Sequence, residues 1–191
     1  MKMNADKPHH WKADIKASVD FYNSWFLKFA PRTYRTQRIS VTAMVDQAIR
    51  SSQDLTAVTD ATIQSHPDIL PVLRMCCCPP IARERLSGLA GVGLPLIATL
   101  EKGKLPGKLK PAALQPYLAK LADTIRELLD IDLFPWLPDG RRAKKDERRM
   151  AASVVADRLC GSMSDPIIRN AQEARQRQSL EGYLVGKASP S

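Results

Sequence analysis

The sequence has few aromatic residues and no long apolar run. Phe, Trp and Tyr make up 6% of the 191 residues. The longest uncharged stretch, residues 86–100, is too short to cross a bilayer and is interrupted by glycine and proline. The N-terminal residues also lack the apolar core of a signal peptide. These absences argue against a membrane-spanning or secreted protein and predict a soluble, cytoplasmic one.

Cysteine and glycine motifs are equally sparse. The four cysteines are Cys76, Cys77, Cys78 and Cys160. Three adjacent side chains point in different directions, so neither a disulfide framework nor a tetrahedral zinc site is expected. Neither GxGxxG nor GK followed by Ser or Thr occurs, so the glycines at 88, 91 and 93 do not form a phosphate-binding loop.

Acidic residues are outnumbered by basic ones. The chain has 29 Lys and Arg against 20 Asp and Glu, which gives a net charge of +9 and a pI near 9.6. This balance favours a polyanionic partner, because each phosphate neutralised releases counterions. Nucleic acid is the first candidate, and a basic protein without such a partner is the alternative.

Apolar residues recur at helical spacing in two long segments, and no segment alternates as a strand would. We expect a helix over 11–29, ended by Pro31, with its stripe in the core, and a second long helix that follows a basic loop before Pro111 and carries the other stripe. The stripes comprise Ile15, Val19, Tyr22, Phe26 and Phe29, and Leu114, Leu118, Leu121, Ile125 and Leu128. The sequence therefore predicts an all-α protein, a multi-helical bundle in which orthogonal short helices surround two or three longer ones. We expect a single helical domain over 1–186 and a tail over 187–191.

Start and stop signals divide the rest of the chain into shorter helices. Ser40 or Thr42 is expected to cap a short helix that ends before a turn at 51–54, and Thr59 is expected to cap the next. Near the C-terminus, Gly161 is expected to end one helix. Ser164-Asp165-Pro166 is expected to begin another. A basic linker and a helix pair are therefore predicted over 139–185.

Basic residues are densest in RRAKKDERR, residues 141–149. Side chains presented from a helix start in this way can bind the DNA backbone, which adds salt-sensitive affinity but no sequence information. A solvated helix end is the alternative. The candidate DNA-binding residues are Arg141, Arg142, Lys144, Lys145, Arg148, Arg149, Lys102, Lys104, Arg83 and Arg85.

Three acidic residues that are close in sequence could suggest a metal site, but their context argues against one. Asp130, Asp132 and Asp139 lie close together in sequence, but a nuclease metal site needs carboxylates and a lysine on a rigid strand, and this region carries helix and turn signals. We therefore assign neither a metal ligand nor a catalytic residue. The polar residues of the C-terminal segment are expected to form a structural network; they are Asp157, Arg158, Asp165, Arg169, Asn170 and Glu173.

Residues 80–104 contain a unit that is similar to the turn and second helix of phage-repressor-like helix-turn-helix proteins. The similarity lies in the spacing of Leu89-Ala90-Gly91-Val92-Gly93, Ile97 and Glu101 to Lys104. Such a helix would read bases in the major groove. However, Leu94, Pro95, Leu96 and Ala98 stand where base-reading polar side chains would be needed. A helical hairpin in the core is the favoured interpretation.

Several segments together resemble one protein family. They are WKADIKASVDFYNSWFLKFAPRTYR (11–35), PPIARERLSGLAGV (79–92), LFPWL (133–137), ADRLCG (156–161) and DPIIRNAQE (165–173), followed by a helix that ends near GY. This pattern, which spans nearly the whole chain, looks like the helical N-terminal region of XamI-type type II restriction endonucleases.

The resemblance implies magnesium-dependent cleavage of both strands of a short specific DNA site. In the family this region is followed by a β-containing nuclease core with a PD-(D/E)xK-like metal site. We therefore expect the chain to be the N-terminal, DNA-binding or positioning part of such an enzyme, with duplex DNA as its partner and a homodimer as one option. A stand-alone helix-turn-helix-like regulator, or a helical interaction module without nuclease activity, is the alternative.

Overall fold

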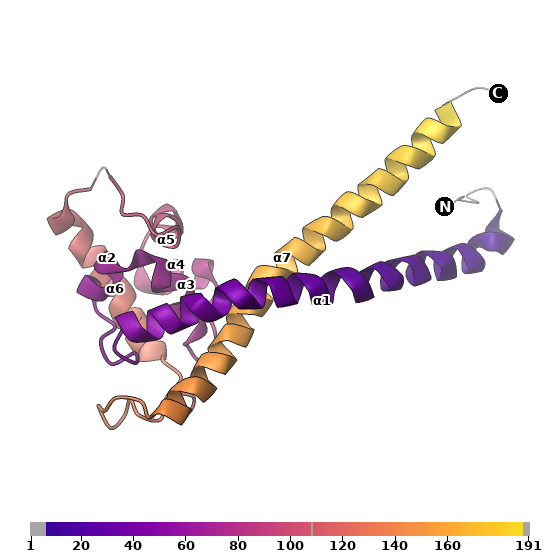
Figure 1. Cartoon of the computed structure of the whole chain (residues 1–191). Helices are drawn as coiled ribbons and strands as arrows, with labels where there is room; N and C mark the ends of the chain where they lie inside the picture. Colours follow the sequence, from indigo (N-terminus) through magenta and orange to yellow (C-terminus); the bar gives the residue numbers. More distant parts are fainter. Residues whose placement is uncertain (1–6, 108, 189–191) are drawn as a thin grey trace. The chain divides into compact units, whose positions relative to one another are not determined.

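The computed structural model describes residues 7–107 and 109–188, and this part of the chain is helical without a named strand, as predicted. Figure 1 shows the helices in sequence colours. They are η1 (Pro8–His10), α1 (Trp11–Ser51), α2 (Asp60–Ser65), η2 (Pro67–Ile69), α3 (Leu70–Met75), α4 (Arg83–Ala90), α5 (Leu94–Leu100), α6 (Pro111–Leu128) and α7 (Lys145–Ala188). Residues 187 and 188 of the expected tail belong to α7, and 189–191 lie outside the described residues.

Packing divides the chain into two compact units. Unit 1 comprises the N-terminal part of α1 and the C-terminal part of α7, and unit 2 comprises residues 38–160. Unit 2 holds the shorter helices α2 to α6, which lie together in Figure 1. Its interior includes Phe134 and Trp136, whose rings meet edge to face with centroids 5.5 Å apart. Unit 2 thus contains a full hydrophobic core.

Helix α6 carries the best amphipathic pattern and follows the prediction closely. Leu114, Leu118, Leu121 and Ile125 are buried, and α6 packs against α2 and α4. The helix begins at Pro111, where a missing backbone N–H costs nothing because the first turn has no intrahelical acceptor for it. One strong apolar stripe is therefore enough to place this helix correctly.

Helix α1 corrects the prediction that Pro31 ends the first helix. The helix continues through Pro31 to Ser51, so the expected loop and second short helix do not form. Proline removes one backbone hydrogen bond and crowds the preceding turn, which is costly but tolerated inside a long helix. Neither Ser40 nor Thr42 caps a new helix, because both lie inside α1. The Thr42 hydroxyl instead donates to the carbonyl of Arg38, four residues earlier, at 2.8 Å.

The apolar stripe of α1 within unit 1 was predicted to be core and is largely exposed. Ile15 is 64% exposed and Val19 is 49% exposed. The aromatic residues lie along the helix surface and contact one another, with the rings of Trp25 and Phe29 stacked at 5.0 Å. Helical spacing identified the helix correctly, but it did not establish that its apolar face is buried.

Helix α7 corrects the predicted helix pair over 139–185. A single helix runs from Lys145 to Ala188 and includes Gly161 and Pro166. Gly161 is therefore not a left-handed cap, and Ser164, although fully buried, does not begin a new helix. Within unit 1, Arg175 of α7 lies over the ring of Phe21, 4.1 Å from its centroid.

None of the helices in the described part of the chain is both long and apolar enough to cross a membrane.

Candidate nucleic-acid interface

Residues 129–140 form a bent connector after α6, and the basic segment 141–149 joins this connector to the start of α7. Glu147, in the first turn of α7, accepts a hydrogen bond from the backbone N–H of Lys144 at 2.8 Å, as in a capping box. The Arg141 guanidinium donates to both oxygens of the same carboxylate, at 2.8 and 2.7 Å. Arg141 and Lys144 together lower the pKa of Glu147 to about 2. Arg141 is thus engaged in fixing the start of the helix.

A left-handed turn follows α1 and places Asp54 inside unit 2. Gln53, Asp54 and Leu55 have φ values of 50°, 61° and 65°, a region that non-glycine residues rarely adopt. The turn is held by its neighbours: Asp54 donates its backbone N–H to Ile49 O at 2.8 Å. Its carbonyl accepts the indole N–H of Trp136 at 2.7 Å. The Asp54 backbone is therefore held at both its N–H and its carbonyl, and this fixes where the side chain begins.

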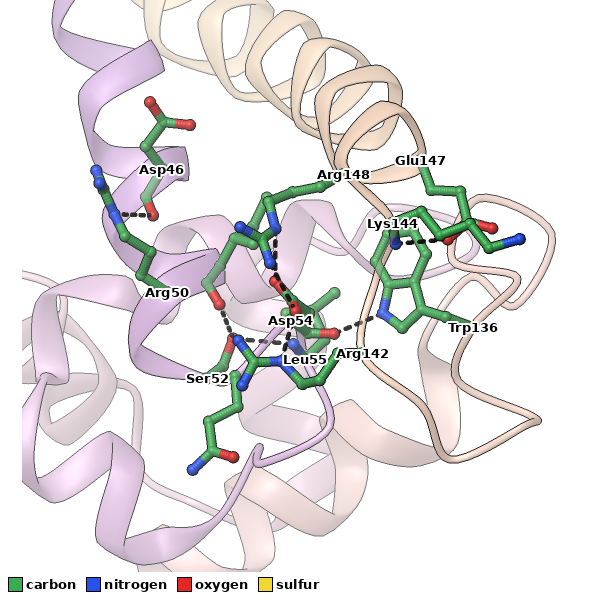
Figure 2. Close-up of polar contacts among 12 residues, drawn as sticks. Asp46, Arg50, Ser52, Asp54, Leu55, Trp136, Arg142, Lys144, Glu147 and Arg148 are labelled. Atoms are coloured by element: carbon green, nitrogen blue, oxygen red, sulfur yellow. Dashed lines mark hydrogen bonds and ion pairs between the residues drawn. The ribbon is translucent and has the colours of Figure 1, made fainter.

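Asp54 binds two arginines of the basic segment, as Figure 2 shows. Its carboxylate is fully buried and lies 2.6 Å from Nε of Arg142. Arg148 reaches it with Nε at 2.8 Å and Nη2 at 2.9 Å. Burial alone would raise the pKa of Asp54, but the two guanidiniums outweigh it and hold the pKa below its ordinary value. The carboxylate is therefore ionised at neutral pH, and the trio carries a net charge of about +1.

The other predicted basic residues are distributed over unit 2. Lys144, Lys145, Lys102, Lys104 and Arg85 are exposed. Arg149 is exposed and pairs with Asp146 at 3.3 Å. Arg83 differs, because it pairs with Glu101, which also accepts a hydrogen bond from Arg74 at 2.8 Å. The segment 141–149 is therefore the part of the predicted set that the structure brings together most closely.

The helix-turn-helix-like unit forms two helices, α4 and α5, joined at Gly91 in a left-handed conformation. Helix α5 has seven residues, and its Ile97 and Leu100 are buried. Its first turn presents Leu94 and Pro95 to solvent, and neither side chain can donate or accept a hydrogen bond at a base edge. The hairpin contributes to the core of unit 2.

The predicted polar network has a different centre from the one expected. Arg158 donates to the carboxylate of Asp130 at 3.0 Å and to the carbonyl of Met75 at 3.1 Å, and neither partner was in the predicted set. Asp157 is exposed. The remaining members, Asp165, Arg169, Asn170 and Glu173, are exposed along α7. Their role in a network stays a prediction.

The residues present do not fit a magnesium site. Asp130 is engaged by Arg158 and by the backbone N–H of Leu133, and Asp139 pairs with Arg141. Among residues 7–107 and 109–188, no three His, Cys, Asp or Glu side chains are grouped as metal ligands. A hard dication needs several convergent oxygen ligands, so we derive no metal-dependent step from this part of the chain.

Sequence reasoning missed Asp54 as a site residue. The turn at 51–54 was predicted and forms, but Asp54 gave no local signal of its role. Its partners lie 88 and 94 residues further along the chain. Only the tertiary fold brings the acid to the basic segment, so spacing within either segment could not have revealed the contact.

Comparison with known proteins identifies the family. The family model described as XamI restriction endonuclease matches residues 53–188. The Type II restriction enzyme SalI of Streptomyces albus G is 47% identical over 185 residues. The alignment covers 97% of this chain and 59% of that relative, so the chain spans less than two thirds of the relative's length. No solved structure matches the chain significantly. The matched region includes Asp54, the bent connector and α7, and the chain belongs to the XamI restriction endonuclease family.

Proposed function

We propose that this chain is the DNA-binding and positioning part of a type II restriction endonuclease. In this proposal it holds duplex DNA, and the complete enzyme cleaves both strands at a specific site with Mg²⁺ bound elsewhere. Family membership supports the class of reaction. The assignment of DNA binding to this chain is supported by its organised basic segment. Its described residues include no group of carboxylates arranged as metal ligands.

The observation that carries the proposal is the basic segment 141–149. Two of its arginine side chains are anchored yet partly exposed, with Arg142 at 57% and Arg148 at 41%. Two neighbouring lysines, Lys144 and Lys145, are exposed beside them in sequence. Guanidinium and ammonium groups bind phosphate oxygens through charge-assisted hydrogen bonds. The segment is therefore suited to grip the DNA backbone, and base readout is left to other parts of the enzyme.

Charge reversal tests the proposal directly. Lys145→Glu should weaken binding of a duplex of about 20 base pairs, alike for two unrelated sequences. One lost phosphate contact should reduce the slope of log affinity against log salt by about 1. Fluorescence anisotropy over a salt series measures both quantities. Lys120→Glu, the same charge change at an exposed position on α6, is the matched control and should have a much smaller effect.

The proposal fails if the wild-type chain shows no salt-dependent attraction to DNA, or if the two variants lose affinity equally. Equal loss would mean that net charge alone governs binding and that 141–149 is an ordinary solvated helix end.

We also propose that the protein acts in the cytoplasm as a homodimer. Two equivalent strands of a short site are matched most simply by two copies related by a two-fold axis. Sedimentation equilibrium with and without duplex DNA tests this, and a monomer under both conditions would contradict it.

A further inference from the structure

The arginines of the proposed DNA-binding segment are held by an acid from a distant part of the chain. Arg142 and Arg148 both reach Asp54, which is completely buried in the turn after α1 (Figure 2). This carboxylate lies directly beneath two cations that should attract phosphate. Its presence there is unexpected on charge grounds alone. Its negative charge opposes the binding of another anion. The contact therefore needs an explanation beyond net charge.

The Asp54 backbone is fixed unusually firmly. Ser52 accepts the N–H of Leu55 at 3.2 Å on its hydroxyl, and the same hydroxyl donates to Ala48 O at 2.7 Å. With the bonds to Ile49 and Trp136, the turn is tied to α1 on one side and to the bent connector on the other. Three successive left-handed residues persist only where the surroundings determine the backbone. Asp54 is thus a rigid anchor.

The anchor uses only some of the donors that the arginines carry. A guanidinium has five N–H groups. Asp54 accepts hydrogen bonds from Nε of Arg142 and from Nη2 of Arg148. Nε of Arg148 lies 2.8 Å from the other carboxylate oxygen, as an ion pair without a hydrogen bond. Both side chains remain substantially exposed. Each arginine can therefore bind the carboxylate on one side and an incoming anion on the other. Immobilising a long side chain in advance also lowers the entropy lost on binding.

We propose that Asp54 is a positioning residue that aims Arg142 and Arg148 at phosphates of the bound DNA. This inference rests on the proposed function, because it requires the segment 141–149 to contact the DNA backbone. The competing explanation is a purely structural ion pair, in which Asp54 only holds the connector against the turn after α1 and DNA affinity follows net charge. The two explanations predict opposite signs for one substitution.

Asp54→Asn separates them, because it keeps the shape of the side chain and removes its charge. If net charge governed binding, losing an anion would strengthen affinity for DNA. If Asp54 positions the arginines, affinity should fall about tenfold, and the salt slope should decrease by 1 to 2 as ordered phosphate contacts are lost. Fluorescence anisotropy over a salt series gives both values, and far-ultraviolet circular dichroism verifies the helical content.

Asp146→Asn is the matched control. It makes the same chemical change at an exposed acid of the segment 141–149, which pairs with Arg149. Its DNA affinity should be unchanged or slightly higher. In an Arg142→Ala/Arg148→Ala background, Asp54→Asn should have no further effect on affinity, because it acts only through those two side chains.

A second pair of variants covers the case in which Asp54→Asn does not fold. Arg142→Lys and Arg148→Lys keep the charge but lack the planar fork that can bridge a carboxylate and a phosphate. Each should weaken DNA binding several-fold, whereas Arg126→Lys, the same change at an exposed arginine on α6, should be close to neutral.

The inference is overturned if folded Asp54→Asn binds DNA as tightly as wild type or more tightly, or if the lysine variants at 142 and 148 bind DNA as tightly as Arg126→Lys. The proposed function fails separately, if wild type lacks salt-dependent binding or if Lys145→Glu behaves like Lys120→Glu. A positive result for Lys145→Glu with a negative one for Asp54→Asn would remove only the positioning role.

Discussion

Two acids of unit 2 have buried side chains that are each held by two arginines. Asp54 is held by Arg142 and Arg148, and Glu101 is held by Arg74 and Arg83. A buried carboxylate without a partner would be strongly destabilising, and arginine suits the task because its planar group offers several donors at once. Part of the chain's basic excess therefore serves the fold, and net charge overstates the number of residues available to DNA.

Glu147 gives a pH-dependent prediction at this scale. Its pKa falls from an ordinary 4.5 to about 2 in the folded protein. Its ionised form therefore stabilises the fold above pH 4.5, and this contribution is lost as the pH falls from 4.5 towards 2. The difference in urea midpoint between wild type and Glu147→Gln should be largest near pH 6 and should shrink progressively below pH 4.5. A difference that stays constant across this range would contradict the assignment.

At the scale of elements, proline and glycine ended helices less often than their local preferences suggest. Helix α1 passes through Pro31, and α7 passes through Gly161 and Pro166. A helix is cooperative, so one unfavourable residue is absorbed when the flanking turns are strongly helical. By contrast, Gly91 does end α4 in a left-handed conformation. The same residue type is thus a cap at one position and a helical residue at the other.

Alanine substitutions distinguish these two glycines. A Cβ added at Gly161 meets no atom within 4 Å, so Gly161→Ala should stabilise the protein by about 0.5–1 kcal/mol, as alanine does in a helix interior. Gly91→Ala, at a φ of +60°, should instead destabilise it by about 1 kcal/mol. Urea unfolding followed by circular dichroism measures both changes. Destabilisation by Gly161→Ala would restore the predicted break in α7.

These elements also show what could be predicted from sequence alone. The existence of α6 and most of its buried face followed from one apolar stripe, and the Thr59 cap of α2 followed from one side chain. The continuity of α1 and α7 was missed, because the rules for proline and glycine describe only their immediate neighbours. The Asp54 anchor was also missed, because its two arginine partners lie 88 and 94 residues further along the sequence. Helix stripes and caps can therefore be predicted from sequence, whereas ion pairs between distant segments cannot.

At the scale of the whole molecule, apolar burial is distributed very unevenly. Within the described residues, every buried apolar side chain except Ala30 lies in unit 2. Unit 1 leaves large apolar residues exposed, among them Leu27 at 72%. Since burial of apolar surface dominates folding stability, unit 2 should provide most of the cooperative unfolding free energy. Substitutions in its core should therefore govern whether the protein folds.

Leu118 and Leu89 provide a matched test of this distribution. Leu118 is fully buried on α6, whereas Leu89 on α4 is 54% exposed within the same unit. Leu118→Ala removes contacts and leaves a cavity, so it should lower the unfolding free energy by about 2–5 kcal/mol. Leu89→Ala should change it by no more than about 0.5 kcal/mol. Urea titration followed by tryptophan fluorescence in a Trp11→Phe/Trp25→Phe background reports on the buried Trp136 and therefore on unit 2. Similar losses for both variants would show that the face of α4 carrying Leu89 is covered in solution.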